Sequence, residues 1–409
     1  MNAPGMPPSP QSLLAEVPMA PRDPILGVTE AYVADKNPAK VNLGVGVYYD
    51  ESGKVPLLEC VKRAEAQRIA SGAPKSYLPI DGLAAYDEAV KRLVFGEDSP
   101  AVKEKRIVTV QAIGGTGGLK IGADLLHHIA PGSKVWISDP SWENHRALFE
   151  GAGFTVETYP YFDAASHGVN FEAMLATLSG LPARSIVVLH ACCHNPTGAD
   201  LTREQWEQVV ACVKARGLVP FLDLAYQGFG DGLAPDGEPV RMFAAAMSPV
   251  LVSSSFSKSF SLYGERVGAF SLLAGSADEA ARVLSQVKRV VRANYSNPPT
   301  HGGDIVARVL STPELRKLWD EELDAIRNRI KSLRKALVDG IHERVPGRDF
   351  SFILKQKGMF SYSGLTKEQV GRLREEFSIY ALDSGRICVA ALNSKNIGYV
   401  ADAIAKVIR

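Results

Sequence analysis

The sequence predicts an α/β protein: a large domain with a mostly parallel sheet covered by helices, plus a smaller α+β domain. Between residues 106 and 274, short apolar runs typical of strands alternate with helical patterns. The runs are continuously apolar, which indicates strands that are buried on both faces, as in a parallel sheet. After residue 275 the pattern changes to long, charged, amphipathic helices, which indicates a second unit.

Five strands are predicted in the large domain, at 106–110, 134–138, 185–189, 219–224 and 250–254. The helical patterns between them cover 118–129, 144–152, 171–178 and 203–217. Ligands of open α/β sheets bind beyond the carboxyl ends of the strands. We therefore expect the functional residues to stand where these apolar runs end.

The rest of the chain predicts helices at 276–293 and 313–344, β-like segments at 350–356 and 358–365, a helix at 366–377, a segment at 386–392 and a terminal helix. The N-terminal segment is expected to join this smaller unit. The predicted organisation is an N-terminal arm at 1–22, a small domain made of 23–56 and 326–409, and a large domain at 57–325.

Composition narrows the class of partner. The chain has 409 residues, of which 46% are apolar and 8% aromatic, as in an ordinary globular protein. Its 46 Lys and Arg residues nearly balance 45 Asp and Glu residues, so no field of one sign attracts nucleic acid or an anionic membrane. No apolar run approaches the roughly 20 residues that span a bilayer. The expected partners are therefore small molecules or proteins, with no nucleic acid and no membrane.

The cysteines and the N-terminus indicate a cytoplasmic protein. The five cysteines are odd in number and scattered, and Cys192 and Cys193 are adjacent, which suits ordinary disulfide geometry poorly. Metal ligands or redox thiols are the alternative, but no Cys-x-x-Cys spacing supports them, so we expect buried structural cysteines and no metal. The N-terminus has no Lys or Arg before Arg22 and no continuous apolar stretch, so it lacks the parts of a signal peptide. We expect a mobile, proline-rich arm.

A glycine-rich turn follows the first predicted strand in "TVQAIGGTGGLK". The strand, turn and helix would place the backbone N–H groups of Gly115 and Thr116 at a helix N-terminus, where a phosphate binds well. The turn is not a Walker loop, because no Gly-Lys-Ser/Thr closes it. The alternative is a glycine-rich turn with no ligand.

Asp223 stands between Leu222 and Leu224 in "FLDLAYQG". A carboxylate in so apolar a run is costly to bury unless a cation or a strong donor meets it. The alternative is a helix cap or a structural salt bridge. Asn195 begins "NPTG" after another strand, and a plain turn is its alternative explanation.

Lys258 lies in "SSSFSKSFSLYGERVG", directly after an apolar strand. A lysine there can bond covalently to an aldehyde, and Asp223 can pair with a pyridinium nitrogen. The groups that can hold a phosphate are Gly115, Thr116, Ser255, Ser257 and Arg266. One ligand carries all three features, pyridoxal 5′-phosphate.

The motifs resemble those of the fold-type I, class I aminotransferases, which are pyridoxal-phosphate-dependent transferases. The matching patterns are NPTG, D-x-A-Y-Q-G-F and S-x-S-K-x-x-x-L-Y-x-E-R-V-G, and the resemblance extends from residue 23 to the C-terminus. The segments "WISDPSWENH" and "PFLDLAYQGFGDG" are more similar in sequence to bacterial aromatic-amino-acid aminotransferases than to dedicated aspartate enzymes. The first twenty or so residues depart from the family by being longer and richer in proline.

The resemblance implies a role for each candidate residue. Lys258 would hold the cofactor covalently and then act as general acid and base, and Asp223 would pair with the pyridine nitrogen. The other implied contacts to the ring are those of Trp142, Asn195, Tyr226 and, in support of Asp223, His145. The phosphate would be held by Gly115, Thr116, Ser255, Ser257 and Arg266, together with Tyr77 of the partner subunit.

Substrate recognition is implied at two arginines and a mobile segment. Arg386 would pair with the α-carboxylate, because a guanidinium offers the planar fork that a carboxylate needs. Arg292, acting across the interface of a homodimer with shared active sites, would bind the distal carboxylate of a dicarboxylic substrate. Gly46 would belong to a segment that closes over the substrate, and Trp142 and Asn195 would also contact it. For both arginines a surface salt bridge is the alternative.

The implied activity is transamination between tyrosine or phenylalanine and 2-oxoglutarate in two half-reactions, with aspartate also accepted. The alternatives are a dedicated aspartate aminotransferase, other pyridoxal-phosphate chemistry such as α-decarboxylation or elimination, and a non-catalytic sensor of an amino acid or cofactor. The presence of Lys258, Asp223, Tyr226 and Arg386, with no appended DNA-binding segment, disfavours the sensor.

Overall fold

A seven-stranded sheet forms the centre of the computed structural model, which describes residues 12–20 and 24–409. The strand order is β2-β10-β9-β8-β7-β3-β4. The strands are β2 (Ile107–Ile113), β3 (Val135–Asp139), β4 (Val156–Pro160), β7 (Ile186–His190), β8 (Val219–Leu224), β9 (Val250–Ser255) and β10 (Val267–Leu273). Every one of the five predicted strands is present.

The sheet is mostly parallel, as expected. The pairs β3–β4, β3–β7, β7–β8 and β8–β9 are parallel, whereas β10 runs antiparallel to both β2 and β9. Neither β4 nor β10 is among the predicted strands. The sequence VETYP of β4 and the glycine and serine in VGAFSLL of β10 make these strands less uniformly apolar than their neighbours.

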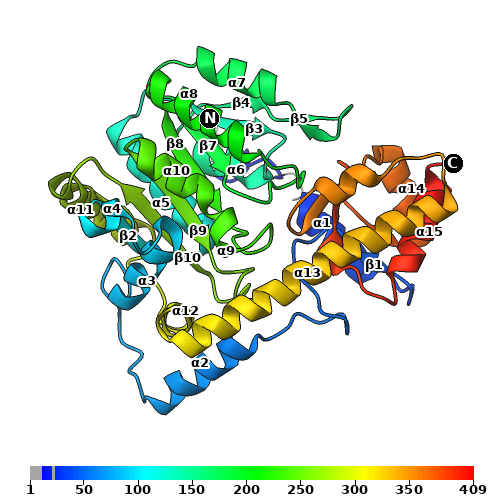
Figure 1. Ribbon diagram of the computed structural model, residues 1–409, viewed down its shortest axis with the longest axis horizontal. Coiled ribbons are helices and arrows are strands. Elements are labelled where there is room, and N and C mark those ends of the chain that lie inside the picture. Colours follow the sequence, from blue (N-terminus) through cyan, green and yellow to red (C-terminus); the bar gives the residue numbers. More distant parts are fainter. Residues whose placement is uncertain (1–11, 21–23) are drawn as a thin grey trace, which may run out of the picture.

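Both faces of the sheet are buried under helices (Figure 1). Successive residues of a strand belong to two different hydrophobic clusters. On β8, Phe221 belongs to one cluster and Leu222 to the other, and on β9 Leu251 and Val252 are divided in the same way. This explains the continuously apolar strand sequences. The helices of this region are α2 (Glu59–Ala70), α3 (Ala84–Phe95), α4 (Pro100–Lys103), α5 (Gly114–Ile129), α6 (Glu143–Glu150), α7 (Phe171–Gly180), α8 (Arg203–Arg216), α9 (Leu233–Asp236), α10 (Glu238–Ala246), α11 (Ala277–Asn294) and α12 (His301–Ser311).

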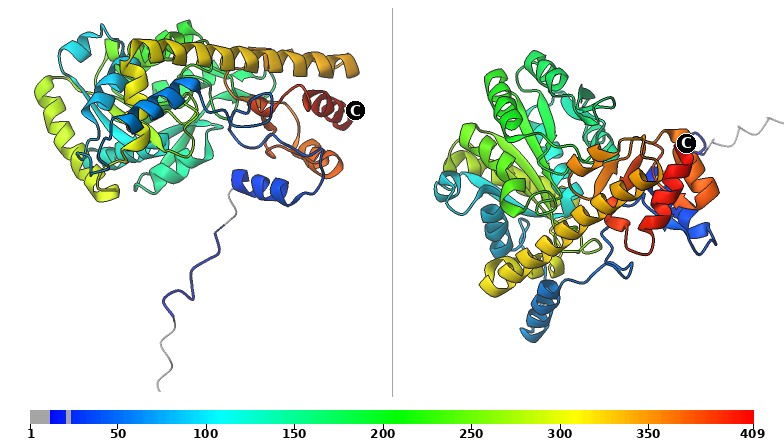
Figure 2. Two further views of the ribbon diagram at one scale, coloured as in Figure 1. Left: turned by 90° about the horizontal axis from the view of Figure 1, so that it is seen from below. Right: turned by 45° about the vertical axis from the view of Figure 1, so that its right-hand side comes forward.

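A long helix, α13 (Pro313–Arg344), extends from the side of this sheet to the C-terminal part of the chain (Figures 1 and 2). Near its start it packs against α2 and α12, and farther along it packs against α15 (Ile397–Val407). Its buried stripe includes Leu323, Ile330 and Leu337, which recur at helical spacing. The helix matches the prediction at 313–344.

Two small sheets lie in the C-terminal part, and one of them also contains a strand from the N-terminal part. Strand β1 (Val41–Asn42) pairs in parallel with β12 (Ile379–Tyr380), and β11 (Phe360–Tyr362) pairs antiparallel with β13 (Arg386–Cys388). The remaining helices and strands are α1 (Pro24–Ala34), β5 (Phe162–Asp163), β6 (Gly168–Val169) and α14 (Lys367–Phe377). The division of the chain into domains at residues 56 and 325 stays a prediction.

One predicted β-like segment is wrong. Residues 351–355 of the segment 350–356 form a 3-10 helix, η1 (Ser351–Lys355), because only Ile353 of this short turn is buried. Within 386–392 the strand ends at Cys388, and a second 3-10 helix, η2 (Val389–Ala391), follows. Short apolar runs do not distinguish a strand from a helical turn.

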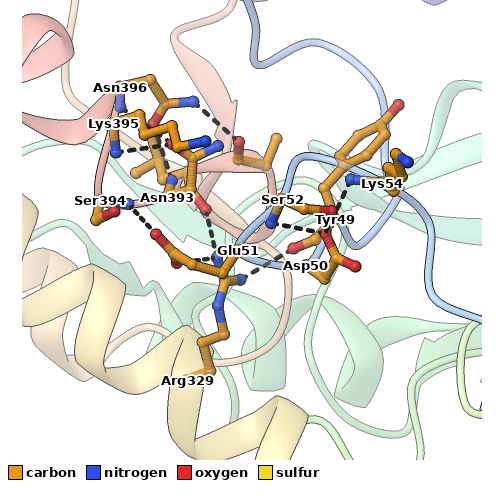
Figure 3. A network of polar contacts seen from close by, with 12 residues as sticks. Tyr49, Asp50, Glu51, Ser52, Lys54, Arg329, Asn393, Ser394, Lys395 and Asn396 are labelled. Atoms are coloured by element: carbon orange, nitrogen blue, oxygen red, sulfur yellow. Dashed lines mark hydrogen bonds and ion pairs between the residues drawn. The ribbon is translucent and has the colours of Figure 1, made fainter.

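Arg329 of α13 fastens the segment after residue 48 to the C-terminal part (Figure 3). Its guanidinium donates to the carbonyl oxygens of Tyr49 at 2.9 Å and Leu392 at 3.1 Å, and to the carboxylate of Glu51 at 3.0 Å. Glu51 also accepts from the backbone N–H of Ser394 at 2.9 Å. The hydrogen bonds with Ser394 and Arg329 lower the pKa of Glu51 to about 2.

The predicted N-terminal arm lies partly outside the described residues, because 1–11 and 21–22 are not among them. Residues 12–20 are exposed and extend away from the rest of the chain (Figure 2). Within 12–20 and 24–409, no helix is long and apolar enough to cross a membrane. All five cysteines carry free thiols, and all except the half-buried Cys212 are buried, as expected.

Candidate active site

A pocket opens at the carboxyl ends of β8 and β9, beside the start of α5. Sequence segments far apart contribute to it, from residue 46 to residue 386. The predicted residues that line it are Gly46, Gly115, Thr116, Trp142, Asn195, Asp223, Tyr226, Ser255, Ser257, Lys258, Arg266 and Arg386. The structure therefore brings most of the candidate residues together.

Lys258 follows β9, and its ammonium lies 4.7 Å from the centre of the Tyr226 ring. Burial lowers the pKa of the Lys258 amine to about 8, although the nearby carboxylate of Asp223 opposes the shift and Arg266 adds to it. A neutral amine is therefore accessible at mildly alkaline pH. The site can supply a nucleophile or a base at this position.

Asp223 is buried near the end of β8 and is held from behind by His145. The distance from His145 Nε2 to Asp223 Oδ2 is 2.9 Å, and Nδ1 of the same ring lies 2.9 Å from Ser141 Oγ. Burial alone would raise the pKa of Asp223, but the hydrogen bond and charge of His145, with smaller contributions from His190 and Lys258, lower it below its ordinary value. Among the described residues, Asp223 Oδ1 accepts no hydrogen bond. The pocket thus presents an anionic oxygen to a cationic donor.

Hydroxyl and guanidinium groups gather at the N-terminus of α5. Ser257 Oγ lies 3.2 Å from Ser255 Oγ and accepts from Arg266 Nη1 at 3.3 Å. Among the described residues, no side chain caps this helix end. The N–H of Gly114 donates to the carbonyl oxygen of Arg266 at 3.0 Å, which leaves the N–H groups of Gly115 and Thr116 for a ligand. Gly114 has φ +67° and a Cβ there would lie 2.4 Å from Arg266 Nη2, so glycine lets the guanidinium approach. Together these donors form a cradle for a phosphate.

Arg386 comes from β13, in the C-terminal part of the chain, and is 1% exposed. It donates to Asn195 Oδ1 at 3.1 Å and to the carbonyl oxygen of Gly44 at 2.6 Å, and it stacks over Phe360 at 4.3 Å. Its Nε is buried and has no hydrogen-bond partner in the described part of the chain. Burial lowers the pKa of Arg386, and an anionic ligand would compensate that loss of hydration.

Trp142 and Tyr226 form apolar walls. Trp142 precedes α6 and meets His145 edge to face, with 5.3 Å between the ring centres. Tyr226 is buried, which raises the pKa of its hydroxyl far above its ordinary value, so the group is a neutral donor. Gly46 lies against Phe360, and a Cβ there would stand 2.5 Å from Cζ of that ring.

Besides His145, which contacts Asp223 from behind, two predicted residues do not line the pocket of their own chain. Tyr77 is 92% exposed. Arg292, at the end of α11, is also exposed and hydrogen-bonds to Ser296 Oγ. Both were expected to act in the partner subunit's site, and that role stays a prediction.

The pocket also contains residues that sequence reasoning missed: Leu119, His190, Ala225, Tyr263 and Phe360. His190 packs between His145 and His194, and burial with the nearby charge of His145 lowers its pKa to about 3, so its ring is neutral. It ends β7 in direct register with Asp223, so the strand pattern could have found it. Phe360 carries no such signal, because it arrives from a distant segment.

Comparison with known proteins shows the family to which the chain belongs. The sequence model of the family "aminotransferase class I and II" matches residues 38–404. An aspartate aminotransferase of Pseudomonas aeruginosa is 60% identical over 97% of this chain and 100% of its own length. An aromatic-amino-acid aminotransferase of Escherichia coli is 52% identical over 94% of this chain and 98% of its own.

Solved structures of aminotransferases are similar to this chain over almost its whole length. The aromatic-amino-acid aminotransferase of Burkholderia pseudomallei, covalently bound to pyridoxal phosphate, superimposes with a TM-score of 0.96 and is 63% identical. The match covers 98% of this chain and 100% of that one. The aromatic amino acid aminotransferase of Burkholderia cenocepacia gives a TM-score of 0.93 at 52% identity, over 97% and 99% of the two chains.

Proposed function

The chain belongs to the class I and II aminotransferase family, and from this premise we propose that it moves the amino group of tyrosine or phenylalanine to 2-oxoglutarate and also accepts aspartate. Its cofactor is pyridoxal 5′-phosphate. The observation that carries the proposal is the convergence of Lys258, Asp223 and the phosphate cradle in one pocket. These groups match an aldehyde, a pyridine nitrogen and a phosphate, so the donor set fits this cofactor.

Lys258 performs two tasks in this proposal. When bound, pyridoxal phosphate supplies a conjugated ring that withdraws electrons from the substrate α-carbon. The amine of Lys258 would hold the cofactor covalently and would be freed when a substrate amine takes its place. The freed amine, with its pKa lowered to about 8, would take the proton from the substrate α-carbon and deliver it to C4′ of the cofactor, and it would move a proton in the opposite direction in the second half-reaction.

Asp223 keeps the pyridine nitrogen protonated by placing a negative charge beside it. His145 holds that carboxylate in place at 2.9 Å, and the lowered pKa keeps it ionised at neutral pH. Trp142, Asn195 and Tyr226 also line the pocket, where Trp142 would pack on the ring and the other two would donate to its phenolic oxygen.

Substrate binding rests on Arg386 and on the partner subunit. The buried fork of Arg386, with its unpartnered Nε, binds the α-carboxylate, and Gly46 lies in the segment that closes over the substrate. We propose that the enzyme is a cytoplasmic homodimer. Tyr77 of the partner subunit completes the phosphate cradle, and the partner's Arg292 binds the distal carboxylate.

A dedicated aspartate aminotransferase is the second candidate, because a relative that is 60% identical carries that name. The ratio of kcat/KM for phenylalanine to kcat/KM for aspartate distinguishes the two candidates. Comparable kcat/KM values for phenylalanine and aspartate support the aromatic enzyme, whereas a strong preference for aspartate supports the alternative.

A single half-reaction tests the proposed chemistry. The holoenzyme is mixed with phenylalanine and no 2-oxo acid, and the products are identified by chromatography and mass spectrometry. The proposal requires the 2-oxo acid of phenylalanine and pyridoxamine phosphate, in amounts equal to the cofactor present. Release of CO2 would instead identify a decarboxylase, and unchanged phenylalanine and cofactor would favour a sensor.

A further inference from the structure

Gln111 stands at a junction that the pocket itself does not include. It lies on β2, the strand at one edge of the central sheet, and it is 1% exposed. At an edge strand the outward backbone groups have no neighbouring strand to bond. At Gln111, two loops form hydrogen bonds in place of a neighbouring strand. One loop follows Tyr77 and the other follows Arg292, the two predicted residues that lie away from the pocket.

The first loop carries Tyr77. The backbone N–H of Gln111 donates to the carbonyl oxygen of Asp81 at 2.8 Å. Its side-chain Oε1 accepts from the backbone N–H of Leu83 at 3.3 Å. Lys288 of α11 adds an ion pair to the carboxylate of Asp81 at 2.9 Å. The segment that follows Tyr77 is therefore fixed to the sheet edge.

The second segment follows Arg292. Gln111 Nε2 donates to the carbonyl oxygen of Pro299 at 2.7 Å. The hydroxyl of Tyr295 donates to the backbone carbonyl oxygen of Gln111 at 3.2 Å. Gln111 thus forms two hydrogen bonds with each segment. Its backbone N–H and side-chain Oε1 bond the first segment, and its backbone carbonyl oxygen and side-chain Nε2 bond the second.

The position of the amide is fixed by packing. A Cβ at Gly82, where φ is +106°, would lie 2.4 Å from the Cβ of Gln111. A Cβ at Gly303 would lie 2.5 Å from Nε2. Glycines on two sides leave just enough room for this side chain. The orientation of the amide also follows from its partners, since Leu83 offers a hydrogen and Pro299 offers a lone pair.

We propose that Gln111 is a positioning residue that sets Tyr77 and Arg292 relative to each other, so that one chain presents both to the partner subunit's pocket. This inference rests on the proposed function. Retention of the cofactor through Tyr77 and recognition of a distal carboxylate through Arg292 are therefore linked at a buried amide outside both sites. Loss of the amide weakens both together and leaves the reaction with phenylalanine largely intact, because a phenyl ring does not use Arg292.

The test compares half-reactions of Gln111→Met holoenzyme, saturated with cofactor, toward aspartate and phenylalanine. We expect kcat/KM for aspartate to fall by about 10- to 100-fold, the scale of a small misplacement of a binding group, with phenylalanine within about twofold. The dissociation constant of the cofactor, measured by its absorbance, should rise in the same variant. Thr109→Val is the matched control, because Thr109 lies on the same strand as Gln111 and its buried hydroxyl hydrogen-bonds to Ser271 Oγ of β10 at 2.9 Å, not to either segment.

Gln111→Glu keeps an oxygen for Leu83 but offers no hydrogen to Pro299 when ionised. This variant should lower kcat/KM for aspartate more than it lowers the affinity for the cofactor. It replaces Gln111→Met in the test if that variant does not fold. Equal losses for aspartate and phenylalanine, or no loss in either variant, would overturn the inference. A wild-type enzyme that converts neither substrate would instead reject the proposed function.

Discussion

Lys258 is the residue on whose protonation the proposed chemistry depends. It stands beside the ring of Tyr226 and is close enough to Asp223 for their charges to interact, in a place where burial favours the neutral amine. A lysine in water is almost fully protonated at neutral pH and is a poor nucleophile. The fold therefore makes the neutral form of this amine accessible, as the proposed covalent attachment and proton transfer require.

Lys258→Ala should abolish turnover and leave the protein folded. The change removes both the covalent anchor and the proton carrier, and a well-placed acid or base alone is worth about 10²- to 10⁴-fold. Steady-state assays and circular dichroism provide the measurements. Near-native rates together with the visible absorption of the bound cofactor would show that another residue carries the role.

The lowered pKa of Lys258 leads to a pH dependence. Only the neutral amine attacks an aldehyde, so capture of pyridoxal phosphate by cofactor-free protein should accelerate as pH rises, with a midpoint near 8. An ordinary lysine peptide has its midpoint near 10.4 and serves as the control. Stopped-flow absorbance across this range gives the two midpoints. Coincidence of the protein with the peptide would mean that the amine is not desolvated before the cofactor binds.

Asp223→Ala should still bind the cofactor through the phosphate cradle but lose most of kcat. Without the carboxylate, nothing keeps the pyridine nitrogen protonated, and loss of one preorganised electrostatic contact costs about 10²- to 10³-fold. The measurement is kcat of protein whose cofactor content is verified by absorbance. An unchanged kcat at full occupancy would leave Asp223 with a purely structural role.

At the scale of elements, the site is built where strands end. Asp223 is the last residue but one of β8, Ser255 ends β9, and the N-terminus of α5 directly follows β2. Such residues could be predicted from sequence because a polar group at the end of an apolar strand is a local signal. His190 has the same signal, one strand away.

Other parts of the fold lacked a local signal. Strand β10 contains Gly268 and Ser271, so its buried character comes from its neighbours rather than from its own sequence. The segment at 351–355 has apolar residues that a strand or a helical turn could equally bury. Arg386 and Gly46 were found only by resemblance, since nothing near them in sequence indicates that they meet a pocket formed by distant strands.

Arg292, near the end of α11, sets specificity in the proposed enzyme. Arg292→Leu should reduce kcat/KM for aspartate and 2-oxoglutarate by roughly 30- to several-thousand-fold, because losing a charge-assisted bond to a desolvated carboxylate costs on the order of 2–5 kcal/mol. The phenylalanine half-reaction should change little. Single-turnover half-reactions make the comparison, since a full cycle requires 2-oxoglutarate. Equal losses for both amino acids would leave Arg292 as a structural support.

At the scale of the whole molecule, the proposed enzyme needs two subunits, because two of its expected site residues lie outside the pocket of their own chain. Tyr77 and Arg292 are exposed, and apolar side chains on the same part of the chain as Tyr77 are exposed as well, with Leu57 at 61% and Ile69 at 79%. Single exposed apolar side chains are common on protein surfaces, so the exposure of Tyr77 and Arg292 is the observation that supports a dimer whose subunits exchange site residues.

A hybrid dimer tests that exchange. Lys258→Ala subunits are mixed with Arg292→Leu subunits, and activity toward aspartate is measured after they exchange. If Arg292 acts across the interface, one site of each hybrid has its own Lys258 and the partner's intact Arg292, so activity returns. If both residues act within one chain, every site lacks one of them. No recovery, with hybrid formation shown by native mass spectrometry, would reject shared sites.

The central claim is that this protein transfers an amino group, and nitrogen-15 follows that group directly. Holoenzyme is incubated with nitrogen-15 phenylalanine and unlabelled 2-oxoglutarate, and the products are examined by mass spectrometry. The account requires the label in glutamate, together with the unlabelled 2-oxo acid of phenylalanine, and requires Lys258→Ala to produce neither. Label found in ammonia or in the decarboxylated amine, or retained wholly in phenylalanine, would contradict it.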